Sequence, residues 1–191
     1  MSNKWFIALA IAFVAQLFVP AQMIFERESI IDEGTAFKFK TAPIDPSDPF
    51  RGKYVYLNFE LDEIHRPDSK KWADQTQAYV VLGEDENGFA KAIGLSASAE
   101  KNSVKARIIA NNYDDQIRII LPFDHFYMDE FKAPAAEKAY TRATIVQALP
   151  ESSSVCYAVV SVKDGEAVVT DVMIDGKSIR EIASEMLQTK Q

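Results

Sequence analysis

Residues 43–61 read PIDPSDPFRGKYVYLNFEL, a proline-rich loop that leads into the most regularly alternating stretch of the chain. Asp45 and Asp48 each precede proline, which drives the preceding residue out of helical geometry. Gly52 then allows a tight entry to a strand. The residues after it alternate between two faces, which predicts a half-buried β-strand. One face carries Val55, Leu57, Phe59 and Leu61, and the other carries Tyr54, Tyr56, Asn58 and Glu60.

The composition indicates a globular domain with an appendage. The chain has 191 residues, of which 48% are hydrophobic, and a formal net charge of −7. An acidic chain without a Lys/Arg cluster argues against binding to nucleic acid or to anionic lipid headgroups. The single cysteine, Cys156, excludes an internal disulfide and a cysteine-based zinc site, and its apolar surroundings favour a buried core residue over a reactive thiol.

The segment from Trp5 to Phe25 predicts contact with a lipid bilayer. Its 21 residues carry no charge, and only Gln16, Pro20 and Gln22 interrupt the apolar run. As a helix it would span roughly 31 Å, close to the hydrocarbon thickness of a membrane. The two terminal aromatic residues suit the membrane interfaces. We therefore predict an uncleaved anchor.

A cleaved signal peptide is the alternative, with Lys4 as a minimal positive region and residues 19–21 as the cleavage site. For an anchor, the positive charge before the span places the amino terminus in the cytoplasm. The prediction is a single-pass protein of the cytoplasmic (inner) membrane, with an anchor at residues 1–28. A domain at residues 29–191 would lie outside, which is the periplasm in a bacterial cell.

The remaining patterns predict a mostly β (α+β) fold, a single antiparallel β-rich domain with one or two packed helices. Asn87-Gly88 and Asp164-Gly165 are the strongest hairpin signals. Residues 62–74 are polar and predict a loop. The expected strands are 35–40, 54–61, 77–82, 89–95, 104–110, 116–121, 125–128, 154–163 and 166–174, and the expected helices are 133–149 and 178–187, with Ser178 as the N-cap.

The central stretch resembles the bacterial family named for its GDYXXLXY motif. In GKYVYLNF, the residues Gly52, Tyr54 and Leu57 keep the pattern, while Lys53 replaces aspartate and Phe59 replaces the final tyrosine. The later segment FDHFYMDEFKAPAAEKAY is similar to the family's aromatic and acidic stretch, here represented by Tyr127, Glu130 and Glu137. Members are small and membrane-anchored and are commonly encoded beside polytopic membrane proteins. The resemblance thus implies a membrane partner and does not point to any particular reaction. Lys53 argues against chemistry that needs a carboxylate there.

Two groups of motif residues are candidates for partner binding. Asp45, Asp48 and Arg51 would form an anion- or partner-binding loop, or would only pin that loop to the domain through local hydrogen bonds. Tyr54 and Tyr56 would offer a partner surface if their face is uncovered, or would pack against a helix or the core.

Other candidate sites have weaker patterns. His65 and His125 lie 60 residues apart in expected loops, without any metal-ligand spacing, so we predict no metal and no cofactor. Glu130 and Glu137 would be paired acids on one helix, but Pro134 between them favours a loop contact and a solvated helix residue.

The preferred hypothesis is a non-enzymatic accessory protein that binds a polytopic partner through its anchor. One alternative is a membrane-bound hydrolase, since the order of the anchor and two aromatic strands is similar to that of signal peptidases, which would also give the fold. Such chemistry needs a serine and a desolvated lysine. Ser47 and Lys91 would have to serve, without the signature that surrounds the peptidase serine. A small-ligand-binding module that uses the tyrosine face is the other alternative.

Overall fold

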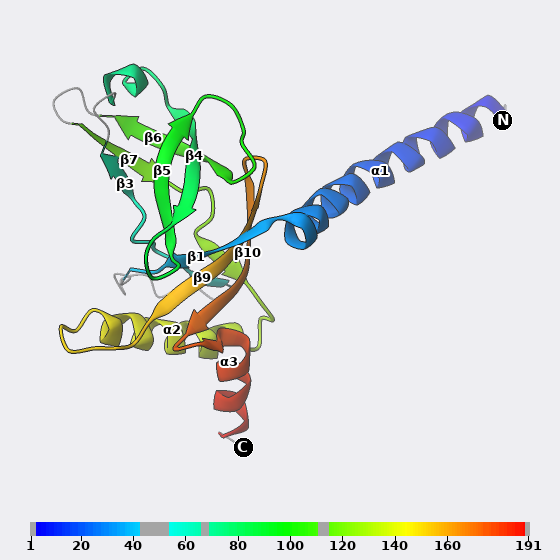
Figure 1. Ribbon diagram of the computed structural model, residues 1–191. Helices are drawn as coiled ribbons and strands as arrows, with labels where there is room; N and C mark the ends of the chain where they lie inside the picture. Colours follow the sequence, from blue (N-terminus) through cyan, green and yellow to red (C-terminus); the bar gives the residue numbers. More distant parts are fainter. Residues whose placement is uncertain (1–2, 43–53, 66–68, 111–114, 190–191) are drawn as a thin grey trace.

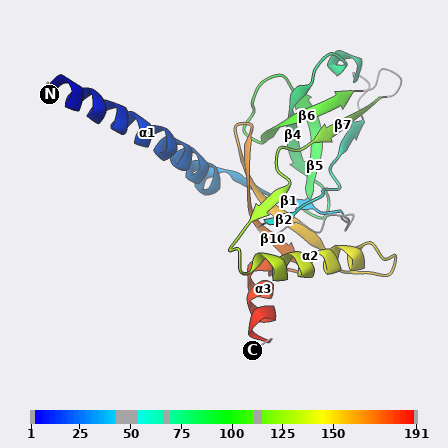
Figure 2. The same ribbon diagram turned by 180° about the vertical axis from the view of Figure 1, so that it is seen from behind.

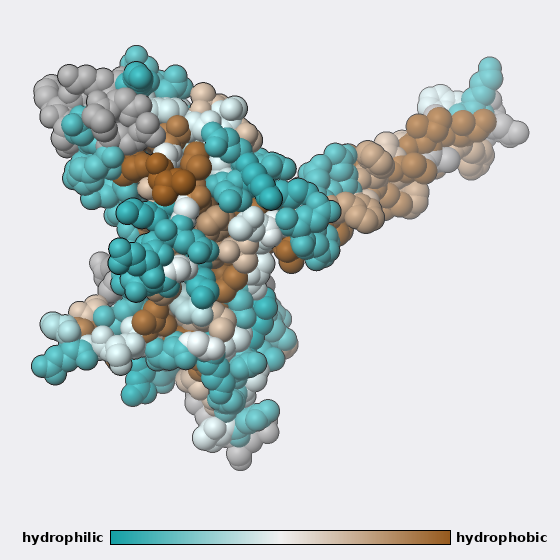
Figure 3. All heavy atoms as spheres, viewed as in Figure 1, coloured by the Kyte–Doolittle hydropathy of each residue, from teal (hydrophilic) through white to brown (hydrophobic). Residues whose placement is uncertain are grey.

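The chain folds into a β-rich domain from which one long helix projects. The computed structural model describes residues 3–42, 54–65, 69–110 and 115–189 and is shown from two sides in Figures 1 and 2. Helix α1 spans Asn3–Glu33 and thus continues past the predicted membrane segment. Within the described residues, it is the one helix long and apolar enough to cross a membrane. Figure 3 shows that apolar residues cover most of the surface of α1 where it extends away from the domain.

The joint between α1 and the domain is a single residue, Gly34, after which strand β1 begins at Thr35. The Ile30 side chain is buried, and its carbonyl accepts a hydrogen bond of 2.6 Å from the Ser161 hydroxyl. The Lys163 ammonium contacts the Ser29 hydroxyl and the Glu33 carboxylate, at 2.7 Å each. The last two turns of α1 are therefore packed on the domain.

The first sheet has the antiparallel order β1-β9-β10-β11 and receives α1 at one end. The predicted hairpin at Asp164-Gly165 is confirmed, since both residues take positive φ, 49° and 92°, as a type I′ turn requires. The strands are β1 (Thr35–Lys40), β9 (Cys156–Lys163), β10 (Glu166–Ile174) and β11 (Lys177–Ser178).

The second sheet has the order β3-β7-β6-β4-β5. The predicted hairpin at Asn87-Gly88 is confirmed, with Gly88 at φ +76°, and the expected strands 104–110 and 116–121 pair with each other. The prediction of a loop over residues 62–74 is wrong. The buried Ile64 lies on a short strand that pairs with β7, and a 3₁₀ helix follows that strand. The elements are β3 (Glu63–His65), η1 (Ser69–Trp72), β4 (Gln77–Glu84), β5 (Ala90–Ser96), β6 (Ser103–Ala110) and β7 (Gln116–Ile120).

The motif stretch forms a shorter strand than predicted. Strand β2 covers Tyr54–Tyr56, and among the described strands it pairs with β8 (His125–Tyr127) alone. Beyond it, Leu57 still bonds to the Asp124 carbonyl, but Phe59 bridges to Thr41 at the end of β1. The chain stays extended while its hydrogen-bonding partner changes, so no continuous ladder forms. The predicted inward face is confirmed, since Val55, Leu57 and Phe59 are buried.

Two helices lie at the end of the domain farther from the second sheet (Figure 1). Helix α2 (Ala133–Gln147) packs on β2 and β9, and its buried face includes Tyr140. Helix α3 (Ile179–Gln188) begins at the predicted N-cap Ser178, whose hydroxyl accepts from the Arg180 amide. The Arg180 guanidinium lies 4.8 Å from the ring centre of Phe126 on β8.

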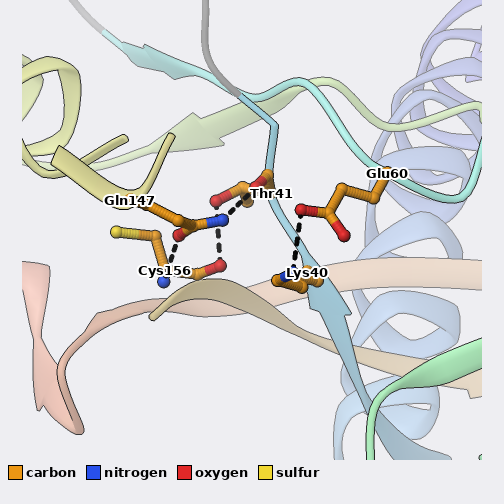
Figure 4. A network of polar contacts seen from close by, with 5 residues as sticks. All are labelled: Lys40, Thr41, Glu60, Gln147 and Cys156. Carbon is orange, nitrogen blue, oxygen red and sulfur yellow. Dashed lines mark hydrogen bonds and ion pairs between the residues drawn. The ribbon is translucent and has the colours of Figure 1, made fainter. Parts of the chain in front are cut away.

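A polar clamp fixes the end of α2 to the first sheet (Figure 4). The Gln147 side-chain amide donates to the Thr41 carbonyl at 2.7 Å and accepts from the Cys156 amide at 2.6 Å. The Thr41 hydroxyl donates to the Cys156 carbonyl at 3.0 Å. Nearby, Lys40 and Glu60 form an ion pair of 3.0 Å. The hydrogen bonds of the Gln147 and Thr41 side chains satisfy backbone groups where the end of α2 meets the strand ends.

Candidate functional site

The candidate site is built on the antiparallel pair β2–β8, which joins the two segments that carry the family resemblance. In its register, Tyr54 pairs with Tyr127 and Tyr56 pairs with His125. The intervening pair, Val55 and Phe126, points into the core. Because side chains alternate along a strand, the four paired polar aromatics share the opposite face. We call Tyr54, Tyr56, His125 and Tyr127 the aromatic cluster.

His125 is the centre of the aromatic cluster. Its ring centroid lies 4.3 Å from that of Tyr54 and 5.5 Å from that of Tyr56, both edge-to-face, and it stacks on Tyr127 at 6.1 Å. The His125 Nδ1 also contacts the Asp124 carboxylate. This contact orients the imidazole, while Tyr127 remains 70% exposed and leaves one side of the cluster open to solvent.

A cleft of about 540 Å³ opens beside the aromatic cluster, at the base of α1. We call it the α1 cleft. Four parts of the chain form its walls: the end of α1, strand β6, the β9–β10 hairpin, and β8 with the segment before it. It is lined by Arg27, Lys105, Pro122, Phe123, Asp124, His125, Tyr127 and residues 165–169. The Arg27 guanidinium reaches the Ala167 carbonyl at 3.5 Å, a long contact that leaves its other donors available.

The structure brings together some of the predicted site residues and separates others. Tyr54, Tyr56 and Tyr127 meet in the aromatic cluster. Leu57 and Phe59, also in the motif, are buried in the core. The loop residues Asp45, Asp48, Arg51 and Gly52, and Lys53 of the motif, lie outside the described residues.

The two acidic candidates do not share a helix. Glu130 lies in the turn before α2, whereas Glu137 is inside α2, which begins only at Ala133. Helical spacing therefore does not pair them, as Pro134 suggested. The expected loop position of His65 is wrong, because His65 is on β3, whereas His125 is on β8, which confirms the expected strand at 125–128. Among the described residues no group of His, Cys, Asp and Glu side chains is arranged to hold a metal ion.

The nucleophile candidates have unfavourable surroundings. Cys156 is fully buried, and burial together with the charge of Asp175 raises the pKa of its thiol to about 11. The thiol is thus protonated at neutral pH, which suits the predicted core role. Lys91 is exposed on β5, whereas a catalytic lysine base needs desolvation. Ser47 lies outside the described residues.

Sequence reasoning considered His125 only as a metal ligand and did not predict its central place in the aromatic cluster, and it missed both cations of the α1 cleft. The two-residue spacing of Tyr54 and Tyr56, and of His125 and Tyr127, was a usable signal. If those two strands pair, the four rings can lie on one face of the pair. Arg27 and Lys105 gave no such signal, because they meet only through the packing of α1 beside β6 and β10.

Comparison with known proteins settles the family. The family model described as GDYXXLXY protein matches residues 16–172, which include the second half of α1, the Gly34 joint, both strands of the aromatic cluster and the β9–β10 hairpin. The chain belongs to the GDYXXLXY family. No curated protein and no solved structure gave a significant match. The family membership predicted from the motif is therefore confirmed, together with the β-rich fold built around it.

Proposed function

We propose that this GDYXXLXY protein is a membrane-anchored accessory protein that binds a polytopic membrane protein. Helix α1 would remain in the cytoplasmic membrane, and the β-rich domain would lie outside it, in the periplasm of a bacterial cell. The apolar side chains of α1 that face away from the domain, such as Phe13 and Leu17, are more than half exposed and would contact lipid or another helix.

The observation that carries this proposal is the joint at Gly34. A flexible linker would let the domain reorient freely relative to its anchor. Here the helix runs directly into β1, with Ile30 buried and Lys163 bonded to its last turn. The orientation of the domain would then be set by the orientation of α1 in the bilayer. Such an arrangement suits the presentation of one fixed surface to a partner in the same membrane.

Two glutamines in the membrane segment support recognition through α1. The Gln22 side-chain amide donates to Glu26 within the helix, at 2.8 Å. Gln16 is exposed near the middle of the segment, and the described residues offer its amide no side-chain partner. An amide in hydrocarbon gains from a hydrogen bond to a neighbouring helix. Gln16 is therefore the proposed contact with the partner.

Replacing Gln16 with leucine is expected to lower recovery of the partner. We expect the full-length protein, purified from native membranes in mild detergent, to carry a multi-span protein in stoichiometric amount. Loss of one interhelical hydrogen bond should reduce that recovery roughly three- to tenfold in Gln16→Leu. Quantitative mass spectrometry of the two purified samples measures the change.

Gln22→Leu is the matched control, because Gln22 is satisfied within α1 and lies on a different side of the helix. Its partner recovery should equal that of the unmodified protein. The absence of any multi-span protein would contradict the accessory function. Equal recovery with all three chains would instead move recognition to the β-rich domain.

A further inference from the structure

The α1 cleft carries unpaired charges of both signs. Arg27 and Lys105 line it, and neither forms an ion pair with a described residue. Glu166 lies on the same lining, while the Asp124 carboxylate is engaged by His125. A cleft of about 540 Å³ with two available cations and one available carboxylate complements a zwitterionic ligand better than a simple anion.

The position of Arg27 at the end of the membrane segment also sets the depth of the cleft relative to the bilayer. Arg27 follows Phe25, the last residue of the apolar segment, by two positions, or about 3 Å along a helix. If α1 spans the bilayer, Arg27 is at the level of the lipid headgroups. Because Arg27 is on α1 and Lys105 is on β6, the packing of α1 on the domain holds the cleft at that level.

We propose that the α1 cleft binds the headgroup of a phospholipid that carries a phosphate and a primary ammonium group. This inference rests on the proposed retention of α1 in the membrane. The phosphate would accept hydrogen bonds from the Arg27 guanidinium and the Lys105 ammonium. The lipid ammonium would donate to the Glu166 carboxylate, and the exposed Tyr127 ring offers it an aromatic face.

This assignment agrees with the overall charge of the protein. A chain with a net charge of −7 repels a strongly anionic surface, which is the basis of the sequence argument against anionic headgroups. A phosphoethanolamine headgroup has no net charge and so avoids that repulsion. Its two charges are matched locally in the cleft, and the lipid would fix the domain against the membrane surface beside α1.

Lipid titration of the full-length protein in a nonionic detergent tests the proposal. The probes are short-chain phosphatidylethanolamine, short-chain phosphatidylglycerol and free phosphoethanolamine, each followed by calorimetry. We expect one saturable site that prefers phosphatidylethanolamine over the other two by about tenfold, since each charged contact to the headgroup contributes at that level. The double variant Arg27→Gln/Lys105→Gln should lose about tenfold or more in affinity for that lipid.

Two further variants sharpen the result. Glu166→Gln should weaken binding of phosphatidylethanolamine and leave binding of phosphatidylglycerol unchanged. Lys71→Gln, an exposed lysine on η1 at the far end of the second sheet, should bind as the unmodified protein does. Unchanged binding by the Arg27/Lys105 variant, or equal loss in Lys71→Gln, would overturn the proposed site.

The choice of ligand is tested separately. Equal affinity for phosphatidylglycerol would overturn the role given to the ammonium group, and equal affinity for free phosphoethanolamine would overturn the assignment to a lipid. A protein that recovers no polytopic partner but shows the expected lipid preference would contradict only the accessory function. Both proposals require α1 to stay in the membrane, but the partner recovery and the lipid titration distinguish the failure of one from the failure of the other.

Discussion

Gly34→Ala is expected to destabilise the protein by about 3 kcal/mol, the upper end of the cost of overpacking a tight site. A Cβ atom at this position would lie 2.3 Å from the Ile30 carbonyl oxygen and 2.4 Å from the Ser161 hydroxyl oxygen. Both atoms are held by the hydrogen bond between them, so neither can withdraw without loosening the joint. Urea unfolding of the full-length protein in detergent measures the change.

The same substitution should expose the chain at the joint. If α1 separates from β9, a protease would gain access to the residues around Gly34, which are otherwise packed on the sheet. Gly88→Ala is the matched control, since its φ of +76° is strained for alanine but no atom lies within 4 Å of the added Cβ. That control should cost only about 1 kcal/mol and leave the joint resistant. Equal destabilisation by the two substitutions would contradict a tightly packed joint.

Tyr140→Ala is expected to cost about 3–5 kcal/mol, as for other large aromatic truncations in a core. Tyr140 is fully buried on α2, between that helix and the motif strand. Burial also raises the pKa of its hydroxyl well above the usual range. Its loss would leave a cavity beneath β2, so the near-ultraviolet dichroism of the aromatic cluster should weaken along with stability.

Tyr140→Phe separates the ring from the hydroxyl. The hydroxyl lies beside Thr41 and the backbone of Asn58 but makes no hydrogen bond of good geometry with a described residue. Its removal should therefore change the unfolding free energy by no more than about 1 kcal/mol. A loss in Tyr140→Phe comparable to that in Tyr140→Ala would show that the hydroxyl, and not packing of the ring, holds α2 on β2.

Local sequence signals predicted the elements of this fold well where a turn or a cap determines them. Asp164-Gly165 and Asn87-Gly88 specify hairpins because positive φ is needed there, and Ser178 specifies a helix start through its own side chain. The motif stretch was predicted as one long strand because alternation reports which face is buried. It does not report which neighbour supplies the hydrogen bonds, and that neighbour changes from β8 to β1.

The candidate site was only partly predictable for the same reason. Tyr54, Tyr56 and Tyr127 could be singled out from the motifs, and strand pairing then places His125 among them. Arg27 and Lys105 are separated by 78 positions in the sequence and belong to elements of different kinds. They line one cleft only because the end of α1 packs on the first sheet, and no local pattern encodes that contact.

The intact mass of the protein extracted from native membranes tests the central claim, that α1 stays attached and forms one body with the domain. We expect the full chain of 21.4 kDa, beginning at Met1 or Ser2. A chain beginning near Ala21 would contradict the account, because cleavage there would remove most of the membrane segment. Neither an anchored accessory protein nor a cleft held at headgroup level would then be possible.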